Sequence, residues 1–396
     1  MKNVLKLLKV KVNKRNFVVI LGAIAVIYTA FVTIQSINLS KLKSDLEKKN
    51  KELLIEIDSL KKQLTALQNE DQRKKNNDLQ TEISNIQNTY NKASQIYEKL
   101  TDLRALKADT KKLDDLFAQS LAILSNRDYQ QSSSYLDQLS ANIDTEKQKL
   151  LAAAAPANAP SSNSPPSSGS FSGQQVTTPV GSFFVDIIAA DISSTKVIVD
   201  TASDSTCTNN CPVLPLSTYV SRNGAYAGVN GSYFCPSTYP SCAGKTNSFD
   251  LLLMNKNKTY FNSDNNVYSS NPGVIFGGSY IRFVSAVSQW GRDTGIDSMI
   301  SNFPLLVEGG NIRFTGDSDP KQSSRGGRSF VANKGNTVYI GTVFNASVAE
   351  SAQVMKALGM ENALNLDDGG SVALWYGGYK AGPGRDLPNA ILFVKK

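Results

Sequence analysis

The sequence predicts an α+β fold: a C-terminal domain that is mostly β, preceded by a transmembrane helix and an α-helical coiled-coil stalk. Three observations lead to this prediction. An uncharged apolar run lies near the N-terminus, leucines then recur every seven residues, and short β-rich runs fill the second half. We divide the 396 residues into a basic tail (1–15), a transmembrane helix (16–37), a stalk (38–151), a linker (152–180) and a folded domain (181–396).

The apolar run from Phe17 to Ile34 is about long enough to cross the hydrocarbon core of a bilayer. Residues 1–15 before it carry six positive charges and no acid, so the positive-inside rule predicts a cytoplasmic N-terminus. The protein is therefore expected to be a single-pass membrane protein whose C-terminal domain is extracytoplasmic, at the cell surface. A cleaved signal peptide is the less favoured alternative, because the run is long and no clear cleavage site follows it.

The net charge of +8 comes almost entirely from the first fifteen residues, and the rest of the chain is nearly balanced. A protein that follows a nucleic-acid backbone needs lysines and arginines clustered on a folded face. We therefore expect no nucleic-acid partner.

All four cysteines lie in the C-terminal domain, at Cys207, Cys211, Cys235 and Cys242. In an oxidising compartment this pattern predicts two disulfides. Three pairings are possible, and we favour the local one, in which each cysteine pairs with its neighbour in sequence. A zinc site is the alternative; it would need all four thiolates, because the chain has no histidine, and the spacings are unusual for zinc.

The predicted stalk contains a heptad repeat, formed by Leu39, Leu46, Leu53, Leu60 and Leu67. Asn50 then falls at an a position, where a polar residue fixes the register of a coiled coil. A second apolar run spans residues 79–100, and residues 125–129 have the composition of a turn. The stalk is either a parallel dimer, which makes the protein a homo-oligomer, or a folded-back helical hairpin; a specific partner-binding module is less favoured. Residues 152–180 carry no charge and are rich in Pro, Ser and Ala, which predicts a flexible linker.

The C-terminal domain is expected to be mostly sheet. Its clearest helix spans residues 347–359, with Ser347 as N-cap, Glu350 completing a capping box and Gly359 ending the helix. Residues 333–336 (NKGN) predict a hairpin turn. The expected strands lie within 183–192, 196–202, 225–234, 273–278, 280–286, 304–310, 328–344 and 390–396.

Five segments of this domain occur in the order typical of the phosphodiester glycosidase family. They are GVNGSYF (228–234), FPLLVEGG (303–310), GRSFVANKGNTVYIGTV (327–343), AESAQVMKALGMENALNLDDGGS (349–371) and GRDLPNAILF (384–393). The domain of residues 181–396 therefore resembles that family, and the stalk does not. The resemblance implies an enzyme that hydrolyses a sugar-1-phosphodiester. Together with the predicted membrane anchor, this gives an envelope glycan or glycolipid as the expected substrate, and we expect no cofactor.

The chemistry of such a cleavage needs few groups. A phosphate leaving group is a weak base, so it needs its charge neutralised, which an arginine does through a bidentate fork. The anomeric carbon needs a carboxylate, as nucleophile or as base for water. Since the chain has no histidine, carboxylates are the expected proton carriers.

The resemblance assigns these roles by position. Asp367 matches the family's LDGGGS aspartate and is the expected anomeric carboxylate; Arg328 matches the arginine that opens the hairpin and is the expected phosphate clamp. The remaining implied substrate-binding positions are Asn230, Gly231, Asp368, Gly369, Gly370, Ser371, Arg385 and Asn389. The structural alternatives are a turn cap for Asp367, an ion pair with Asp367 for Arg328, and a simple turn at Asn230 and Gly231.

Asp368 departs from the family pattern, which has glycine at this position. Aspartate tolerates the left-handed backbone conformation better than most residues, so we expect the turn to survive. The second carboxylate would raise the pKa of Asp367, recruit a cation such as Ca2+, or change the substrate. The alternative function is a catalytically inactive surface protein that binds glycans, with the stalk as its working part.

Overall fold

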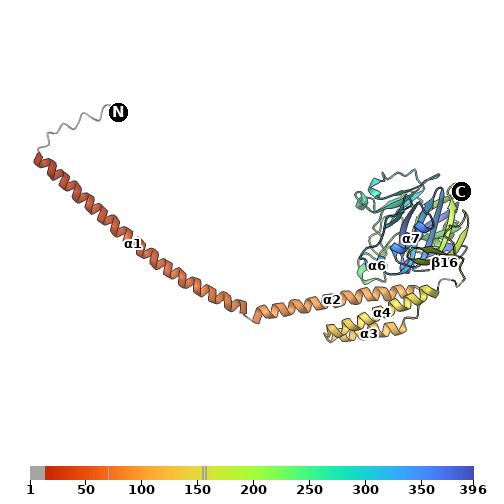
Figure 1. Ribbon diagram of the computed structural model, residues 1–396, viewed down its shortest axis with the longest axis horizontal. Helices are drawn as coiled ribbons and strands as arrows, with labels where there is room; N and C mark the ends of the chain where they lie inside the picture. The colour runs from red at the N-terminus through yellow and green to blue at the C-terminus, as the bar shows by residue number, and fades with distance from the viewer. Residues whose placement is uncertain (1–13, 70, 154–155, 157) are drawn as a thin grey trace, which may run out of the picture. The chain divides into compact units, whose positions relative to one another are not determined.

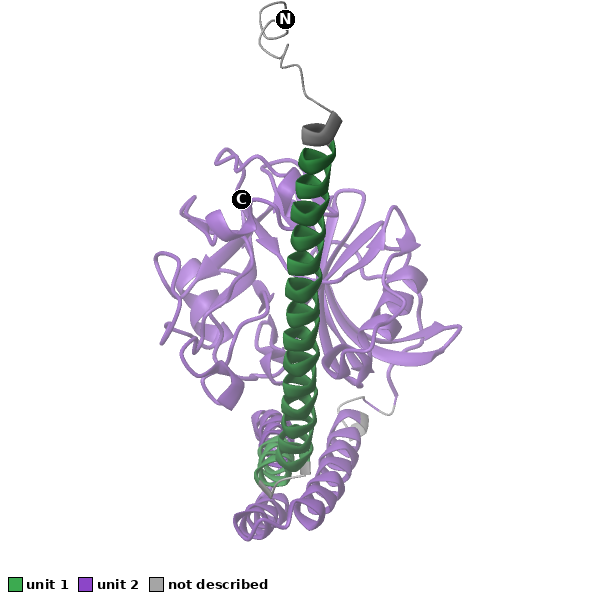
Figure 2. Ribbon diagram, turned by 90° about the vertical axis from the view of Figure 1, so that its left-hand side faces the viewer, with its two compact units in different colours: residues 1–84 green, residues 85–396 purple. Residues whose placement is uncertain are grey.

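The computed structural model describes residues 14–69, 71–153, 156 and 158–396. Most of the predicted basic tail lies outside this range. The chain divides into two compact units, residues 1–84 and residues 85–396, coloured separately in Figure 2. Helix α2 (Asp71–Ala105) contributes to both units, because the division falls between Ser84 and Asn85.

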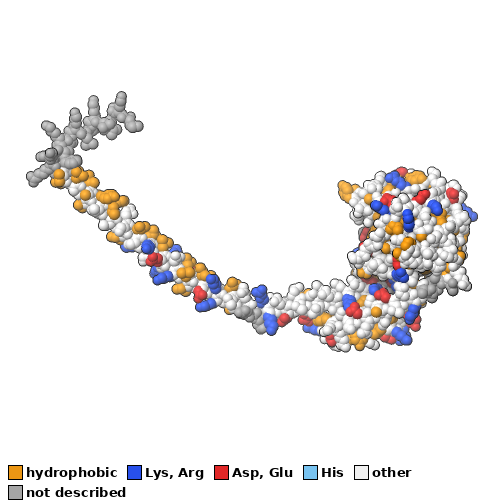
Figure 3. Space-filling model, in the orientation of Figure 1, with side chains coloured by type: hydrophobic (Ala, Val, Ile, Leu, Met, Phe, Trp, Pro, Cys, Tyr) orange, Lys and Arg blue, Asp and Glu red, His pale blue; other side chains and the backbone are white. Residues whose placement is uncertain are grey.

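The first unit consists of helix α1 (Lys14–Asn69) and the start of α2. Within the described residues, one helix is long and apolar enough to cross a membrane, with a mean hydropathy of 2.2 over its best window near the N-terminus; a signal sequence has the same property. The heptad leucines are exposed along α1, and Figure 3 shows hydrophobic side chains on its surface. The predicted long helix is thus present, with its apolar side chains uncovered.

The second unit begins with three helices: the end of α2 from Asn85, then α3 (Lys111–Ser125) and α4 (Tyr129–Ala153) (Figure 1). We call residues 85–153 the three-helix region. Its own apolar core is built from Leu100, Leu103, Leu136, Leu139 and Ile143, among others.

The stalk predicted for residues 38–151 therefore differs from the observed division, since residues 85–151 fold back and join the C-terminal unit. Apolar residues at helical spacing pack equally well in a coiled coil and in a helical bundle, so the sequence pattern alone does not choose between them. The turn predicted at residues 125–129 lies between α3 and α4.

The C-terminal domain contains three antiparallel sheets. The seven-stranded sheet has the order β1-β2-β13-β12-β14-β10-β11, and the two five-stranded sheets have the orders β16-β15-β4-β17-β3 and β6-β5-β9-β7-β8. The strands are β1 (Phe171–Thr178), β2 (Gly181–Asp191), β3 (Thr195–Thr201), β4 (Ala227–Asn230), β5 (Leu253–Met254), β6 (Tyr260–Phe261), β7 (Gly273–Phe276), β8 (Ile281–Val284), β9 (Ser298–Ser301), β10 (Leu305–Glu308), β11 (Asn311–Ile312), β12 (Gly326–Lys334), β13 (Thr337–Ala346), β14 (Asn362–Asp368), β15 (Leu374–Tyr376), β16 (Tyr379–Ala381) and β17 (Asn389–Lys395).

Short helices connect these strands: α5 (Leu216–Asn223), α6 (Pro320–Ser323) and α7 (Val348–Ala357), with 3-10 turns η1 (Pro240–Cys242), η2 (Asp264–Asn266), η3 (Val287–Gln289) and η4 (Gly369–Ser371). Helix α7 has the predicted capping box: Ser347 accepts from the Glu350 N–H, and the Glu350 carboxylate accepts from the Ser347 N–H. The predicted hairpin joins β12 to β13. An α+β domain dominated by sheet is confirmed.

Strand β1 lies inside the segment predicted to be a linker, which corrects that prediction for its last part. All eight residues of β1 pair with β2 at the edge of the seven-stranded sheet. Every second side chain is buried, at Gln174, Val176 and Thr178. The uncharged Pro/Ser-rich composition concealed this two-residue periodicity, which is the ordinary signature of a strand with one buried face.

Two apolar layers fix the end of β14. One is packed from strands of all three sheets, with Val199, Val229, Ile340 and Leu364 among its members. The other lies between the seven-stranded sheet and α7. Because β14 is buried in both layers, its C-terminal end is held firmly beside the ends of β4 and β17.

Candidate active site

Asp367 and Asp368 are the last two residues of strand β14. Both the backbone N–H and the backbone carbonyl of Asp367 form hydrogen bonds. Its N–H donates to the Gly231 carbonyl at 2.9 Å, and its carbonyl accepts from the Asn230 amide at 2.7 Å. Its Oδ1 accepts from the Asp368 N–H at 2.9 Å, and the Ser371 hydroxyl also bonds to the carboxyl. The side chain is therefore fixed in one orientation, with the residue only 9% exposed.

Burial raises the pKa of Asp367 to about 7, and the negative charge of Asp368 adds to this effect. The Ser371 hydroxyl and the Arg385 guanidinium oppose it. A carboxyl whose pKa lies near neutrality can exchange a proton during a reaction at physiological pH. Asp367 thus has the electrostatic character of an acid–base group.

Asp368 has an extended backbone, with φ −121° and ψ 176°, so its position does not call for glycine. The left-handed conformation falls instead on Gly369, with φ 62°. Asp368 turns its side chain inward, where Oδ2 accepts from Arg328 at 2.9 Å, from Asn365 at 2.9 Å and from the Tyr233 hydroxyl at 3.1 Å. Burial raises the pKa of Asp368, and the Arg328 guanidinium opposes that rise.

The structure shows no further ligands for a calcium ion at Asp367 and Asp368 among the residues that it describes. Among the described residues, no group of three or more Asp, Glu, His or Cys side chains is placed to hold a metal ion. Asp368 is also already paired with a guanidinium. A cation at Asp367 and Asp368 stays an untested hypothesis, and no step below uses one.

Arg328 is buried and surrounded by protein oxygen atoms. Its Nε donates to the Ala346 carbonyl at 2.9 Å, and its Nη2 donates to the carbonyls of Lys321, at 3.0 Å, and Ser324. With the Asp368 ion pair, four of its five N–H groups have partners. The arginine predicted as the phosphate clamp thus ties β12 to β13, α6 and the end of β14, and its ion-pair partner is Asp368 rather than Asp367.

Asn230 and Asn389 are fully buried and act as internal cross-links. Besides its bond to Asp367, Asn230 accepts from the Ser329 hydroxyl at 2.7 Å and from the Ala373 N–H at 3.1 Å. Asn389 accepts from the Ser232 N–H at 2.9 Å, and a side chain at Gly231 would overlap Asn389. Both amides therefore hold the strand ends that carry Asp367.

Arg385 is the guanidinium that faces the glycine turn. The backbone N–H of Arg385 donates to the Gly370 carbonyl at 2.9 Å, so the loop before β17 lies against η4. A Cβ at Gly370 would overlap Nη2 of Arg385, so the missing side chain provides the space that the guanidinium fills. Burial lowers the pKa of Arg385, but the charges of Asp102 and, to a smaller extent, Asp367 raise it above its ordinary value. The structure thus brings together Asp367, Gly370, Ser371 and Arg385.

Several site residues were not found by sequence reasoning. Asp102 of α2 forms an ion pair with Arg385, and the Tyr239 hydroxyl donates to Asp102 at 2.5 Å. Tyr233 and Asn365 bind Asp368, as described above. Tyr233 lies in the segment 228–234, which resembles the family, so its hydroxyl was a possible hydrogen-bond donor of the site. The sequence did not indicate a role for Asp102, because a carboxylate on a helix usually faces solvent.

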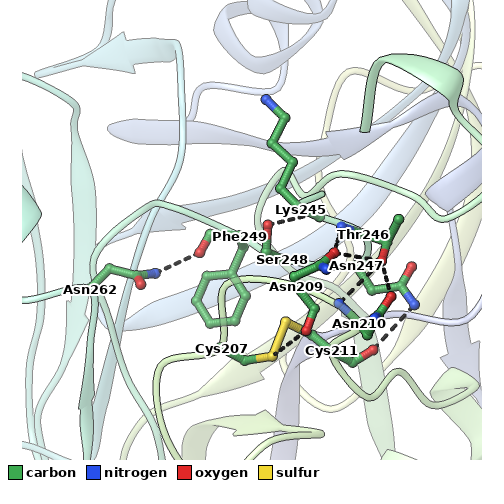
Figure 4. The surroundings of a disulfide bond; sticks show 10 residues. All are labelled: Cys207, Asn209, Asn210, Cys211, Lys245, Thr246, Asn247, Ser248, Phe249 and Asn262. Atoms are coloured by element: carbon green, nitrogen blue, oxygen red, sulfur yellow. Dashed lines mark hydrogen bonds between the residues drawn. A yellow bond between two sulfur atoms is a disulfide. The ribbon is translucent and has the colours of Figure 1, made fainter. Parts of the chain in front are cut away.

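Both local disulfides favoured from the sequence are present, Cys207–Cys211 and Cys235–Cys242. Figure 4 shows the first, where the Asn209 amide oxygen accepts from the N–H and the hydroxyl of Thr246 at 2.9 and 3.0 Å. The second closes the loop that carries Tyr239. The Tyr239 ring lies 5.0 Å from the Arg385 guanidinium, so this disulfide supports one wall of the site.

The family model described as phosphodiester glycosidase matches residues 223–394 of the chain. The resemblance to this family is therefore confirmed for that part of the chain. The match includes β14, the η4 turn and the loop of Arg385.

The solved structures that are similar to the chain include two from different organisms. A hypothetical protein from Synechocystis has 14% identity and a TM-score of 0.42, with 57% of this chain and 62% of that protein covered. The catalytic domain of zebrafish N-acetylglucosamine-1-phosphodiester alpha-N-acetylglucosaminidase, auto-inhibited by its pro-peptide, has 15% identity and a TM-score of 0.43, with 60% and 87% covered. The chain thus spans less than two thirds of the Synechocystis protein. No curated protein sequence matches.

Proposed function

We propose that the C-terminal domain hydrolyses a sugar-1-phosphodiester bond in an envelope glycan or glycolipid. The observation that supports this proposal is that a buried carboxyl, Asp367, interacts electrostatically with a guanidinium, Arg385, that lies against a turn of two glycines. These are the two charged groups that the reaction needs. The family match over the same residues supports the class of reaction.

In the proposed reaction, the carboxylate of Asp367 acts at the anomeric carbon. As a base, it takes a proton from water while the water oxygen bonds to that carbon; as a nucleophile, it bonds to the carbon first and water then releases the sugar. In both routes the bond from the carbon to the phosphate oxygen breaks, and its electrons leave with the phosphate monoester. Arg385 stabilises the charge of that leaving group.

The structure supports a division of labour between the two arginines. Arg385 has 15% of its side chain exposed and faces the turn, whereas Arg328 has 4% exposed and is occupied by carbonyls and Asp368. We therefore assign phosphate binding to Arg385 and a positioning role to Arg328. Asn230 and Asn389 also act as positioning residues, and the Gly369–Gly370 turn provides room for the Arg385 guanidinium.

The proposal includes membrane attachment. The apolar part of α1 anchors the chain, the N-terminus stays in the cytoplasm, and the disulfide-containing domain faces the outside. Two disulfides and one apolar N-terminal helix support this arrangement. In this arrangement the substrate would belong to the cell envelope.

The test uses the full chain in detergent with a panel of sugar-1-phosphodiesters, and measures the release of free sugar. We expect turnover by the wild type and a loss of at least 10³-fold in Asp367→Asn, because the amide can neither accept a proton nor attack the anomeric carbon. Arg385→Ala should lose 10²-fold or more. Asp204→Asn, which changes an exposed carboxylate, is the matched control and should keep wild-type activity.

A second candidate function, glycan binding without catalysis, is favoured by one observation: Arg385 is already paired with a carboxylate, that of Asp102. The same assay separates the two functions. A folded protein that binds glycans but cleaves no diester would establish the binding function and contradict the hydrolase.

A further inference from the structure

Asp102 and Arg385 join two parts of the second unit that are far apart in sequence. The two residues are 283 positions apart, one on helix α2 and the other in the loop before β17. The Asp102 carboxylate receives the Arg385 Nη2 and the Tyr239 hydroxyl on the same oxygen, Oδ1. That oxygen also lies 3.1 Å from the position of a Cβ at Gly370. A carboxylate from the three-helix region thus stands at the glycine turn of the candidate active site.

The contacts around this ion pair are polar. Glu98, one turn before Asp102, accepts hydrogen bonds from the N–H and the hydroxyl of Ser241, and lies 3.8 Å from the Lys321 ammonium. The apolar core of the three-helix region contains only helical residues, and the core clusters of the sheets contain none from these helices, among the residues that the structure describes. Parts held together by a polar interface move relative to each other more readily than parts that share a core.

The ion pair is partly open to solvent. The side chains of Arg385 and Asp102 are 15% and 28% exposed. Because part of each side chain faces water, the solvent screens the attraction between the two charges. An anion of higher charge density, or one with more oxygens, can therefore compete for the same guanidinium.

A phosphate is such an anion. It offers several oxygens to a guanidinium fork, as a carboxylate offers two. A further cation is close by: Nζ of Lys147 on α4 lies 3.5 Å from the position of a Cβ at Gly326, and interacts electrostatically with Asp102. The Asp102 carboxylate therefore interacts with two cations, Arg385 and Lys147.

We propose that the Asp102 carboxylate occupies the place of a phosphate anion on Arg385, so that the three-helix region fills the phosphate subsite until a phosphate displaces it. This inference rests on the proposed function, because it concerns the guanidinium that we assign to the leaving group. It adds the group that competes with the phosphate, which is the Asp102 carboxylate. The three-helix region then controls access to Asp367.

Binding experiments on the full chain in detergent test this subsite. The probes are inorganic phosphate and dimethyl phosphate, titrated by calorimetry at low ionic strength. Asp102→Asn keeps the shape and removes the charge, so its affinity for at least one probe should rise tenfold or more over the wild type. Arg385→Ala should abolish that gain when added to Asp102→Asn. Asp115→Asn, an exposed carboxylate on α3, is the matched control and should bind as the wild type does.

Hydrogen exchange of the wild-type protein provides a second test that does not depend on any variant. Since the Ser241 N–H donates to Glu98, displacement of the helices should speed its hydrogen exchange. We expect the segment 236–242 to exchange severalfold faster when dimethyl phosphate or inorganic phosphate saturates the protein. Exchange that is unchanged or slower at saturation would overturn the displacement.

The outcomes separate this inference from the proposed function. An affinity of Asp102→Asn equal to or lower than that of the wild type would overturn the subsite, even if the protein hydrolyses diesters. A tenfold gain that depends on Arg385 would support the subsite, even if no diester is cleaved. Preference for dimethyl phosphate would identify a diester as the ligand, and preference for inorganic phosphate would identify the free anion; both support a phosphate subsite.

Discussion

The guanidinium of Arg385 occupies the space where Gly370 lacks a side chain. The relationship is steric, because Gly370 does not have a positive φ, which would favour glycine on backbone grounds. Its neighbour Gly369 does have one, at 62°. The two glycines of this turn are therefore needed for different reasons, one for the backbone and the other for the arginine.

Gly370→Ala should displace Arg385 and reduce diester hydrolysis about 10²-fold, since a misplacement of about 1 Å has effects of that size. The rate with the substrate that the wild type cleaves is the measurement. Gly278→Ala is the control, because a Cβ there meets nothing within 4 Å and the residue has no positive φ. Full activity in Gly370→Ala would show that Arg385 does not need its observed position.

The ion pair of Arg328 and Asp368 explains how the chain tolerates aspartate where the family has glycine. Replacing Asp368 by glycine, which restores the family residue, leaves Arg328 buried without its carboxylate. We expect Asp368→Gly to lose about 3–5 kcal/mol of unfolding free energy in denaturant titrations, rather than to be neutral. Arg328→Met should lose a similar amount.

The double variant Arg328→Met/Asp368→Gly tests whether this loss arises from the pair. Its destabilisation should be smaller than the sum of the two single effects by about 1–3 kcal/mol, because neither charge is left alone. Strictly additive losses would mean that the two side chains do not stabilise each other, and the structural account of Asp368 would be wrong.

The candidate site could be predicted in part because the chemistry limits the choice of residue. With no histidine in the chain, a carboxylate is the expected reactive group, and the resemblance to the family points to Asp367. The capping box at Ser347 and the hairpin turn at residues 333–336 were also predictable, since both depend on neighbours in sequence. Such motifs can be predicted because the residues that form them are neighbours in the sequence.

Long-range pairings could not be predicted from the sequence. The choice between Arg328 and Arg385 depends on which one meets Asp368 and which one meets the Gly370 turn. Sheet register sets the first partner, and the path of the loop before β17 sets the second. Asp102 is a more extreme case, because its partner comes 283 residues later. The sequence around a carboxylate on a helix does not indicate which distant residue it will pair with.

Asp367 should make the stability of the fold depend on pH. Its pKa is about 7 in the folded protein and 3.8 ordinarily, so the folded state binds the proton more tightly. Stability is therefore highest below pH 4, falls as the pH rises from about 4 to about 7, and is lowest above that range as far as this group is concerned. The difference is on the order of 4 kcal/mol.

Asp367→Asn removes this effect, because the amide stays neutral. The variant should melt at a higher temperature than the wild type at pH 8, and the two should melt alike at pH 4. Thermal unfolding followed by circular dichroism at both pH values makes the comparison. A variant that is less stable than the wild type at pH 8 would show that the folded state prefers the ionised carboxylate.

The leucine stripe of α1 should hold two copies of the chain together. Leu53 and Leu60 are 48% and 55% exposed in the single chain, although they lie at d positions of a heptad repeat. We expect the full chain to be a dimer in sedimentation experiments, and Leu53→Glu/Leu60→Glu to be a monomer because it places four charges in the seam of the dimer. Ile55→Glu/Glu56→Gln changes exposed positions outside the a/d seam with no change in net charge, and should stay dimeric. A wild type that sediments as a monomer would contradict the coiled coil and favour an unpaired helix.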